Sequence, residues 1–250
     1  MEFVQVSRED GIAKVALTRG KVNALNEPMI TQINDCFADL ENDPRVHAII
    51  LTGSGNFFSF GFDIPEFLTY SKDAFIKFLV KFTDLYSYLF LYPKPVVAAL
   101  NGHTMAGGCM LASTCDYRIM VSGKAKISLN EITFGSSVPA GSIEMLKFCV
   151  GSKNAASILY QGAMYSAAEA FEVGLIDQVT SEENLATEAG KIAKNLSEKE
   201  ESAFRSIKEL LRRPIAEEMK KRELDSILEF VDIWYSEKTW KNLKGIKIRS

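Results

Sequence analysis

Apolar and polar residues alternate along the first segment of the chain, over residues 3–17, and Asp10-Gly11 interrupts the alternation. This pattern predicts a β-hairpin with a tight turn. From Asn26 to Leu40 the apolar residues recur every three or four positions, which predicts an amphipathic helix with Asn26 as its N-cap. The short apolar run over residues 46–52 then predicts a buried strand.

Strands and helices continue to alternate through the middle of the chain. Residues 72–91 have helical periodicity, and Pro93 and Pro95 end that helix. Further short apolar runs predict strands over residues 96–100, 115–121 and 173–179. Strands of this kind, buried on both faces and alternating with helices, are typical of an α/β layered fold.

The last part of the chain, from about residue 181, has a helical pattern and is rich in charge. Its charged runs, such as residues 217–223, are typical of a solvated helical face. Apolar residues in the same helices also need cover, so we expect these helices to pack on the body of the protein or on a neighbouring subunit. We therefore divide the chain into an α/β core over residues 1–195 and a helical region over residues 196–250.

Composition excludes several classes of function. The chain has 29 basic and 32 acidic residues and a net charge of −3, so we expect neither nucleic acid nor an anionic membrane surface as a partner. His47 and His103 are its two histidines, which excludes a multi-histidine metal site and leaves few groups that titrate near pH 7. We expect no metal.

The four cysteines, Cys36, Cys109, Cys115 and Cys149, form no Cys-x-x-Cys pair. The chain has no run of about 18 apolar residues that would span a membrane, and its first residues do not have the pattern of a secretory leader. We therefore expect reduced thiols in the core of a cytoplasmic protein.

Two glycine-containing segments each have a chemical and a purely structural interpretation. In residues 57–64, Gly61 allows an unusual backbone angle that would turn the Phe62 N–H into a cleft, or the segment is a turn capped by Asp63. In residues 101–110, a small-residue loop places free N–H groups at the start of an apolar helix, where an anion or oxyanion is favoured. Alternatively, the Ala-Gly-Gly sequence there only allows close packing.

The third segment is residues 127–143, in which Glu131 is the one charged residue. A carboxylate in apolar surroundings has a raised pKa, in the range useful for proton transfer, unless Glu131 is an exposed or capping residue. Two N–H donors from separate loops and one such carboxylate together suit chemistry through a thioester enolate.

These segments, with residues 21–25, 92–96 and 166–177, resemble the crotonase superfamily, which includes enoyl-CoA hydratases and enoyl-CoA isomerases. The resemblance covers residues 3 to about 210. It implies a crotonase-like spiral of ββα units with a C-terminal helical oligomerisation region, and a homotrimer or hexamer. It also implies an acyl-CoA thioester as the substrate, with no further cofactor.

The resemblance implies roles for individual residues. The backbone N–H groups of Phe62 and Gly107 would hold the thioester oxygen, and Glu131 would be the catalytic acid–base. The other positions expected to bind CoA or substrate are Val22, Ala24, Leu25, Phe60, Asp63, Ile64, Gly108, Met110 and Pro139. Glu144 and Ser137 lie near the expected pocket and could take part, although their interpretation as polar loop residues is favoured.

One departure from the hydratase pattern bears on the reaction. Enoyl-CoA hydratases of this superfamily typically hold a water between two glutamates, and Met110 stands at the position of the first. An isomerase needs one carboxylate, which moves a proton from C2 to C4 of a 3-enoyl thioester. We therefore predict a Δ3,Δ2-enoyl-CoA isomerase with Glu131 as the proton shuttle. The alternatives are a hydratase, another acyl-thioester enzyme such as a decarboxylase or hydrolase, and a catalytically weak protein that interacts with an acyl carrier.

Many aromatic residues between Phe57 and Phe90 bear on the size of the substrate. They would either form the wall of an acyl pocket or pack in the core. A stripe at helical spacing favours the core.

Overall fold

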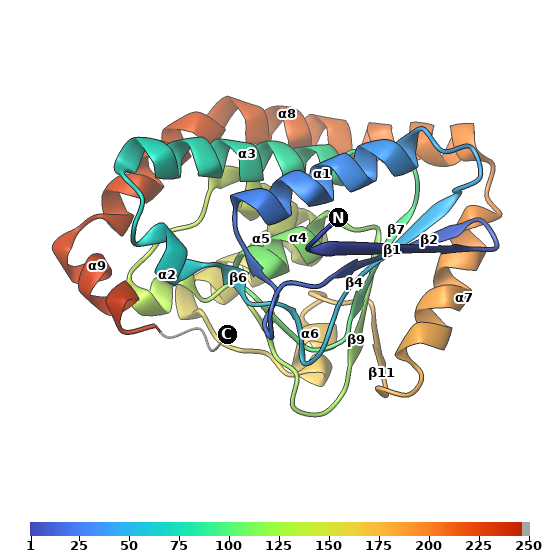
Figure 1. Cartoon of the computed structure of the whole chain (residues 1–250), viewed down its shortest axis with the longest axis horizontal. Coiled ribbons are helices and arrows are strands. Elements are labelled where there is room, and N and C mark those ends of the chain that lie inside the picture. The colour runs from blue at the N-terminus through green and yellow to red at the C-terminus, as the bar shows by residue number, and fades with distance from the viewer. Residues whose placement is uncertain (247–250) are drawn as a thin grey trace.

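The main β-sheet has six strands in the order β1-β2-β4-β7-β9-β11 (Figure 1). The structure is a computed structural model and describes residues 1–246. β1 pairs with β2 in antiparallel orientation, and the other neighbouring pairs are parallel. The strands are β1 (Val4–Glu9), β2 (Ile12–Leu17), β4 (Ala48–Gly53), β7 (Val96–Leu100), β9 (Tyr117–Val121) and β11 (Gln178–Thr180).

Local sequence explains both kinds of pairing. Asp10 and Gly11 have φ values of 47° and 79°, and two successive residues with positive φ form the tight turn that joins β1 to β2. β4 and β7 are apolar and almost entirely buried, as parallel strands covered on both faces are. The structure thus confirms the predicted hairpin and three of the predicted strands, although β4 and β9 begin two residues later than expected.

Two small sheets lie beside the main one and form much of the candidate site. One contains β5 (Phe57–Ser59), β8 (His103–Met105) and β10 (Ile127–Ser128), and the other contains β3 (Ala24–Leu25) and β6 (Gly61–Phe62). All of their pairings are parallel. They pair strands that are about 20 to 50 residues apart in the sequence.

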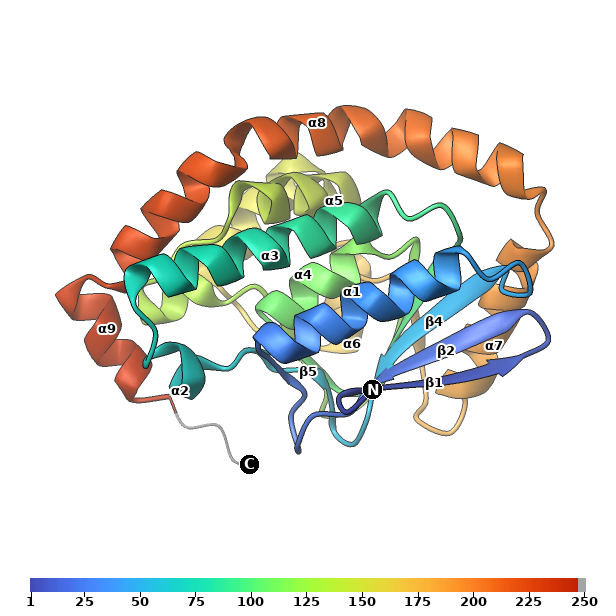
Figure 2. The same cartoon turned by 45° about the horizontal axis from the view of Figure 1, so that its top comes forward.

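Helices surround these sheets. They are α1 (Glu27–Glu41), α2 (Ile64–Phe67), α3 (Lys72–Phe90), α4 (Gly107–Thr114), η1 (Glu131–Phe134), α5 (Ala140–Gln161), α6 (Ala167–Glu172), α7 (Leu185–Ser197), α8 (Glu201–Trp234) and α9 (Glu237–Lys244). α1 begins as predicted, because the Asn26 side chain accepts a hydrogen bond from Met29 N. α7 packs against the strands of the main sheet and lies behind it in Figure 2.

The long helix α8 arches over α3 and α5 (Figure 2) and packs on both. Its first half is anchored by a buried ion cluster, in which Asp116 lies 2.8 Å from Lys208 Nζ and 3.0 Å from Arg212 Nη2. Its last turns pack through aromatic side chains, since the rings of Phe75 and Trp234 have centroids 4.8 Å apart. The expectation that the terminal helices pack on the body of the protein is confirmed.

The strand predicted over residues 173–179 is largely wrong. Val173 is the C-cap of α6, Gly174 has a φ of 80°, and the amides of Leu175 and Ile176 both donate to Ala170 O. These residues form a buried turn, and the strand β11 begins after it, at Gln178. The turn is apolar because Leu175 and Ile176 are buried in it, and a short apolar run of this kind resembles a buried strand in the sequence.

All four cysteines are free thiols, and Cys36, Cys109 and Cys115 are buried. Burial raises the pKa of the Cys36 thiol to about 11 and that of Cys115 to about 12, so neither is a reactive thiolate near neutral pH. Within residues 1–246, no helix has both the length and the hydrophobicity to span a bilayer.

Candidate active site

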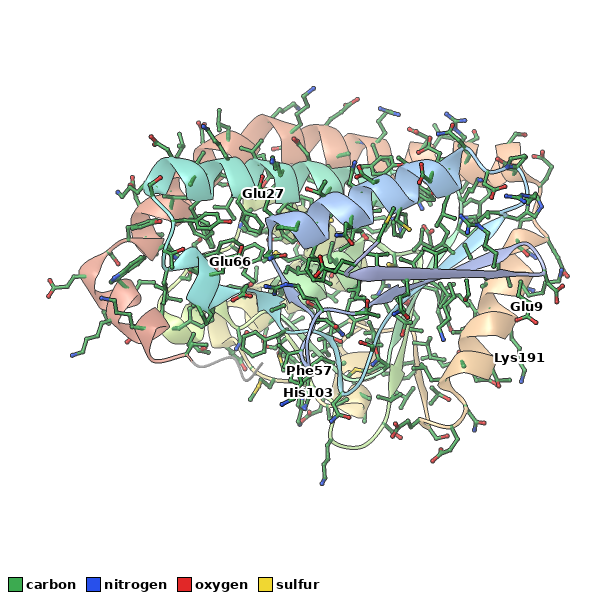
Figure 3. The ribbon with its side chains drawn as sticks, in the orientation of Figure 1. Glu9, Glu27, Phe57, Glu66, His103 and Lys191 are labelled. Atoms are coloured by element: carbon green, nitrogen blue, oxygen red, sulfur yellow. The ribbon has the colours of Figure 1, made fainter. Side chains whose placement is uncertain are left out.

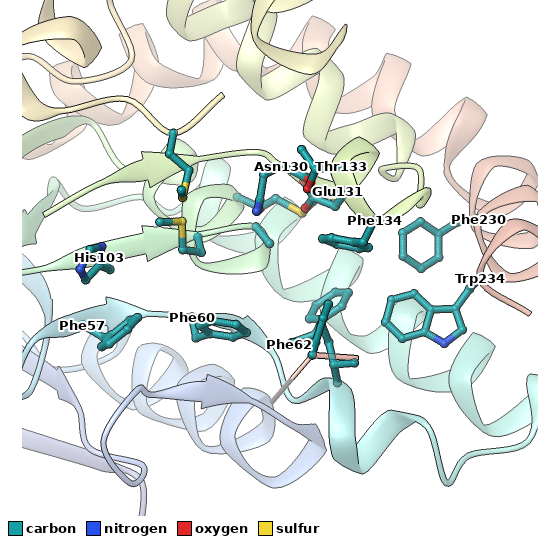
Figure 4. A pocket seen from close by; sticks show the side chains of 16 residues that line it. Phe57, Phe60, Phe62, His103, Asn130, Glu131, Thr133, Phe134, Phe230 and Trp234 are labelled. Atoms are coloured by element: carbon teal, nitrogen blue, oxygen red, sulfur yellow. The ribbon is translucent and has the colours of Figure 1, made fainter. Parts of the chain in front are cut away.

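A cavity of about 450 Å³ lies between the small sheets, α4, η1 and the end of α8. Phe57 and His103 line one end of it, Phe230 and Trp234 line the other, and Glu131 lies between them (Figure 4). The rings of Phe57 and His103 pack together with centroids 5.0 Å apart (Figure 3). The cavity is therefore an apolar channel with a carboxylate partway along its wall.

Glu131 is the first residue of η1 and is only 5% exposed. Its Oε2 atom is buried and has no hydrogen-bond partner in the part of the chain that the structure describes. Burial raises the pKa of the carboxyl from its usual value to about 8, because the ionised form loses its hydration. A buried carboxyl group with one unpartnered oxygen holds a proton near neutral pH and can exchange it with a bound molecule.

This pKa has a consequence for stability. Between the unfolded pKa of 4.5 and the folded value of about 8, the native state binds more protons than the unfolded chain. The free energy of unfolding should therefore decrease as the pH rises through this range, by on the order of a few kcal/mol. A Glu131→Gln variant should lack this contribution and gain stability relative to the wild type between pH 5 and pH 8. Urea denaturation of both proteins at the two pH values measures it, and identical pH dependence would contradict the assigned pKa.

The segments that contain Phe62 and Gly107 are in direct contact. A Cβ atom on Gly61 would lie 2.8 Å from Met105 O and 3.0 Å from Gly107 N, and a Cβ atom on Gly107 would lie 3.1 Å from the Phe62 ring. Gly61 also has a φ of 93°, which favours glycine. A glycine is thus required at residue 61 for two reasons, and its backbone places β6 against the start of α4.

The N-terminus of α4 lies at the cavity wall, where Ala106 and Met110 are lining residues and Gly107 is not. Gly107 opens the helix, and the N-cap residue Ala106 supplies no side-chain acceptor, so the amides of the first turn have no carbonyl acceptor within the helix. Ala106 lines the cavity and has a φ of 48°, a conformation that costs about 1–3 kcal/mol for a residue other than glycine. Its own amide is held by Ser128 O at 2.8 Å.

The structure places some of the sequence-predicted residues in the cavity wall and others outside it. Five of them line the cavity: Phe60, Phe62, Ile64, Met110 and Glu131. Ala24 and Leu25 form β3, which pairs with β6, and half-buried Val22 precedes it. Buried Pro139 is the N-cap position of α5.

For two of the predicted positions, the structure shows the packing or capping alternative. Gly108 allows close packing, because a Cβ atom there would lie 2.7 Å from Ser59 O. Asp63 caps α2, since its Oδ1 accepts from Glu66 N at 3.2 Å, and it also pairs with Arg19 at 2.7 Å.

Glu144 does not line the cavity. Its Oε1 lies 2.7 Å from Arg222 and 3.1 Å from Lys147, so this carboxylate has two cations as partners. Ser137 is likewise not among the lining residues. Both residues thus lie outside the cavity wall as favoured, but the loop prediction is wrong for Glu144, which lies in α5.

Several lining residues were not predicted from the sequence. Phe230 and Trp234 come from the last turns of α8, about 100 residues after Glu131, and Asn130 precedes Glu131 in the wall. His103 also lines the cavity, although no sequence pattern assigned it a role there. A local pattern identifies an apolar helix face but does not say which distant cavity it covers, so no sequence signal placed α8 here.

Comparison with known proteins agrees with this arrangement. The sequence profile described as "Enoyl-CoA hydratase/isomerase" matches residues 7–246. The chain belongs to this family. Its fold is the crotonase fold predicted above, because the crystal structure of human mitochondrial delta3-delta2-enoyl-CoA isomerase superposes with a TM-score of 0.93. That comparison has 28% sequence identity and covers 97% of this chain and 96% of the human one.

Proteins named for different activities are similar to this chain. Crotonyl-CoA hydratase of Syntrophomonas wolfei is 34% identical over 206 residues, which is 82% of this chain and 79% of that protein. Mitochondrial enoyl-CoA delta isomerase 1 of Mus musculus is 29% identical over 226 residues, which is 89% of this chain and 78% of the mouse protein. Family membership therefore establishes hydratase/isomerase-type chemistry and leaves the choice of reaction to the site.

Proposed function

We propose that the protein is a Δ3,Δ2-enoyl-CoA isomerase. The observation that carries this proposal is that the described part of the cavity wall contains a single carboxylate. This carboxylate is Glu131. Met110 is also in the wall, and the resemblance to the family places it where hydratases have their other glutamate. Met110 is 2% exposed and has no group that could activate a water.

In the proposed reaction, the base is the ionised form of Glu131, which a pKa of about 8 makes the minor form near neutral pH, and it removes a proton from C2 of a 3-enoyl thioester. The C–H electron pair moves into the thioester and gives a dienolate, whose oxygen is stabilised by the N–H groups of Phe62 and Gly107. Glu131 then returns the proton to C4, and the double bond moves from C3–C4 to C2–C3. The apolar wall supports this mechanism because it keeps water from competing for the dienolate. No cofactor beyond the CoA of the substrate is required.

Hydration of a 2-enoyl thioester is the second candidate, because a hydratase is among the similar proteins at 34% identity. The two reactions are separated by one experiment. The protein is incubated with 3-enoyl-CoA and, separately, with 2-enoyl-CoA, and double-bond position and water addition are followed. We expect isomerisation of the first and little hydration of the second. Efficient hydration without isomerisation would contradict the proposal.

A substitution at Gly61 tests whether the N–H groups of Phe62 and Gly107 form one oxyanion site. A Gly61→Ala variant should lower kcat at least about tenfold, because the new Cβ pushes β6 away from the start of α4 and small misplacements of catalytic groups cost this much or more. The control is Gly123→Ala, since Gly123 has a similar φ of 96° but open space around its Cα. Steady-state kinetics and thermal melts of both variants make the comparison. An equal loss of kcat in both would assign the effect to backbone strain alone.

The proposal includes a homotrimer or hexamer in the cytoplasm. Apolar side chains on the outer face of α8 support an oligomer, since Leu210 is 76% exposed and Ile207 and Leu211 are more than half exposed. The free thiols support a reducing compartment.

A further inference from the structure

Arg19, in the loop between β2 and β3, contacts three separate groups through its guanidinium. Nη1 lies 2.7 Å from Asp63 Oδ2 and donates a hydrogen bond of 2.8 Å to Ala24 O. Nη2 lies 3.3 Å from Glu66 Oε2. The backbone of Arg19 is held as well, because its N–H donates to Asn23 Oδ1 at 2.9 Å.

Two of these groups adjoin the amide of Phe62. Ala24 lies on β3, directly opposite Gly61 on β6. Asp63 follows Phe62 in the chain, so the Asp63 side chain lies one residue beyond the proposed oxyanion donor. Arg19 therefore bridges the two strands at the point where the peptide of Phe62 is oriented.

Backbone hydrogen bonds join the same two segments without Arg19. Phe60 N donates to Val22 O at 2.9 Å, and Asp63 N donates to Leu25 O at 2.9 Å. These bonds hold β6 beside β3, and Asp63 Oδ1 also caps α2 by accepting from Glu66 N. The guanidinium adds a restraint on the second oxygen of Asp63, so loss of Arg19 should change the orientation of the peptide between Phe62 and Asp63 more than the pairing of the two strands.

The third contact extends the restraint to α2. Glu66, on α2 (Figure 3), also accepts a hydrogen bond of 2.9 Å from Asn26 Nδ2, the N-cap of α1. Arg19 and Asn26 thus hold the same carboxylate from two directions. The Arg19 side chain is 21% exposed, so these interactions are less screened than those of a surface pair.

We propose that Arg19 is a positioning residue for the oxyanion site, which acts through Asp63 and Ala24 to orient the N–H of Phe62. The inference rests on the proposed function, because it takes the Phe62 N–H as one of the two donors to the thioester oxygen. Arginine suits this role because its planar guanidinium presents several donors in fixed directions, whereas a lysine ammonium is a single point charge on a flexible stem.

The test reads the hydrogen bonds to the thioester oxygen directly. A 2-enoyl-CoA labelled with ¹³C at the thioester carbonyl is bound to each protein, and its carbonyl stretch is measured by infrared difference spectroscopy. In the wild type the stretch should lie at lower frequency than in water, because the N–H donors polarise the carbonyl. In Arg19→Gln it should shift back toward the solution value, and kcat for 3-enoyl-CoA should fall by about tenfold or more, with KM changed less than about threefold.

Two further variants separate positioning from folding. Asp63→Asn keeps the N-cap of α2, since asparagine caps as well as aspartate, but it removes the charge that pairs with Arg19 and should show the same shift in carbonyl stretch. Arg19→Lys should give an intermediate stretch and kcat. The matched control is Arg45→Gln, which removes another arginine paired to an aspartate, Asp43, and should leave both readouts unchanged.

The outcomes distinguish a failure of the role proposed for Arg19 from a failure of the proposed isomerase function. An Arg19→Gln protein with the wild-type carbonyl stretch and kcat overturns the role of Arg19 and leaves the proposed function standing. A wild-type protein that neither polarises the carbonyl nor isomerises 3-enoyl-CoA overturns the proposed function itself. A loss of kcat that only follows a loss of thermal stability, with the carbonyl stretch unchanged, also overturns the positioning role.

Discussion

A Glu131→Gln variant should lose the isomerisation of 3-enoyl-CoA by about 10³-fold, within the range reported for removal of a positioned acid–base group. Glutamine has nearly the shape of glutamate, so the cavity should keep its form, but its amide cannot accept and return a proton. Binding of a saturated acyl-CoA, measured by calorimetry, should change little because Glu131 acts on the reacting carbons. The predicted signature is a large fall in kcat with retained binding.

Glu144→Gln is the control for this experiment. Glu144 is also a glutamate near the start of α5, but it pairs with Arg222 and Lys147 and does not line the cavity. Its replacement should leave kcat close to that of the wild type. Wild-type turnover in Glu131→Gln, or a comparable loss in Glu144→Gln, would move the proton-transfer role away from Glu131 alone.

The largest effect on stability is expected at Asp116. An Asp116→Asn variant should lower the free energy of unfolding by about 3–5 kcal/mol, because it leaves the buried cations Lys208 and Arg212 without their shared carboxylate. Both cations are about 5% exposed, and desolvation lowers the pKa of Lys208. For a chain of this length the melting temperature should fall by about 10 °C.

Asp232→Asn is the matched control for Asp116→Asn, because Asp232 also pairs with a lysine, Lys72, at 2.9 Å. The Asp232 side chain is 76% exposed, and exposed pairs contribute little to stability. Urea denaturation of both variants should show a large change at Asp116 and none that can be resolved at Asp232. Equal effects would mean that the buried Asp116 cluster contributes no more to the free energy of unfolding than an exposed ion pair.

Most of the main sheet could be predicted because its signals are local. The turn at Asp10-Gly11, the N-cap at Asn26 and the apolar runs of β4 and β7 each lie within a few residues of the element they specify. The small sheets could not be predicted, since β3 and β6 have two residues each and show no periodicity. β11 was misplaced because the turn after α6 is as apolar as a strand.

The burial of Glu131 could be predicted because it is the one charge in residues 127–143. Its next neighbour Ile132 is nevertheless 47% exposed, so the apolar stretch around Glu131 in the chain is not what covers it. The aromatic residues were harder, because Phe60 and Phe62 line the cavity while Phe75 and Phe78 are core residues, and the spacing alone favoured the core. The far wall depends on α8 folding back over the body, which no short window of sequence contains.

Helix α8 contributes to the cavity wall but does not contain the proposed catalytic groups. Its first half is fixed by the Asp116 cluster, and its last turns provide Phe230 and Trp234 at the end of the cavity away from His103. None of these residues belongs to the elements that hold Glu131, Phe62 or Gly107. For the proposed enzyme, substitutions in one helix can therefore reshape that end of the cavity without changing the elements that carry Glu131, Phe62 and Gly107.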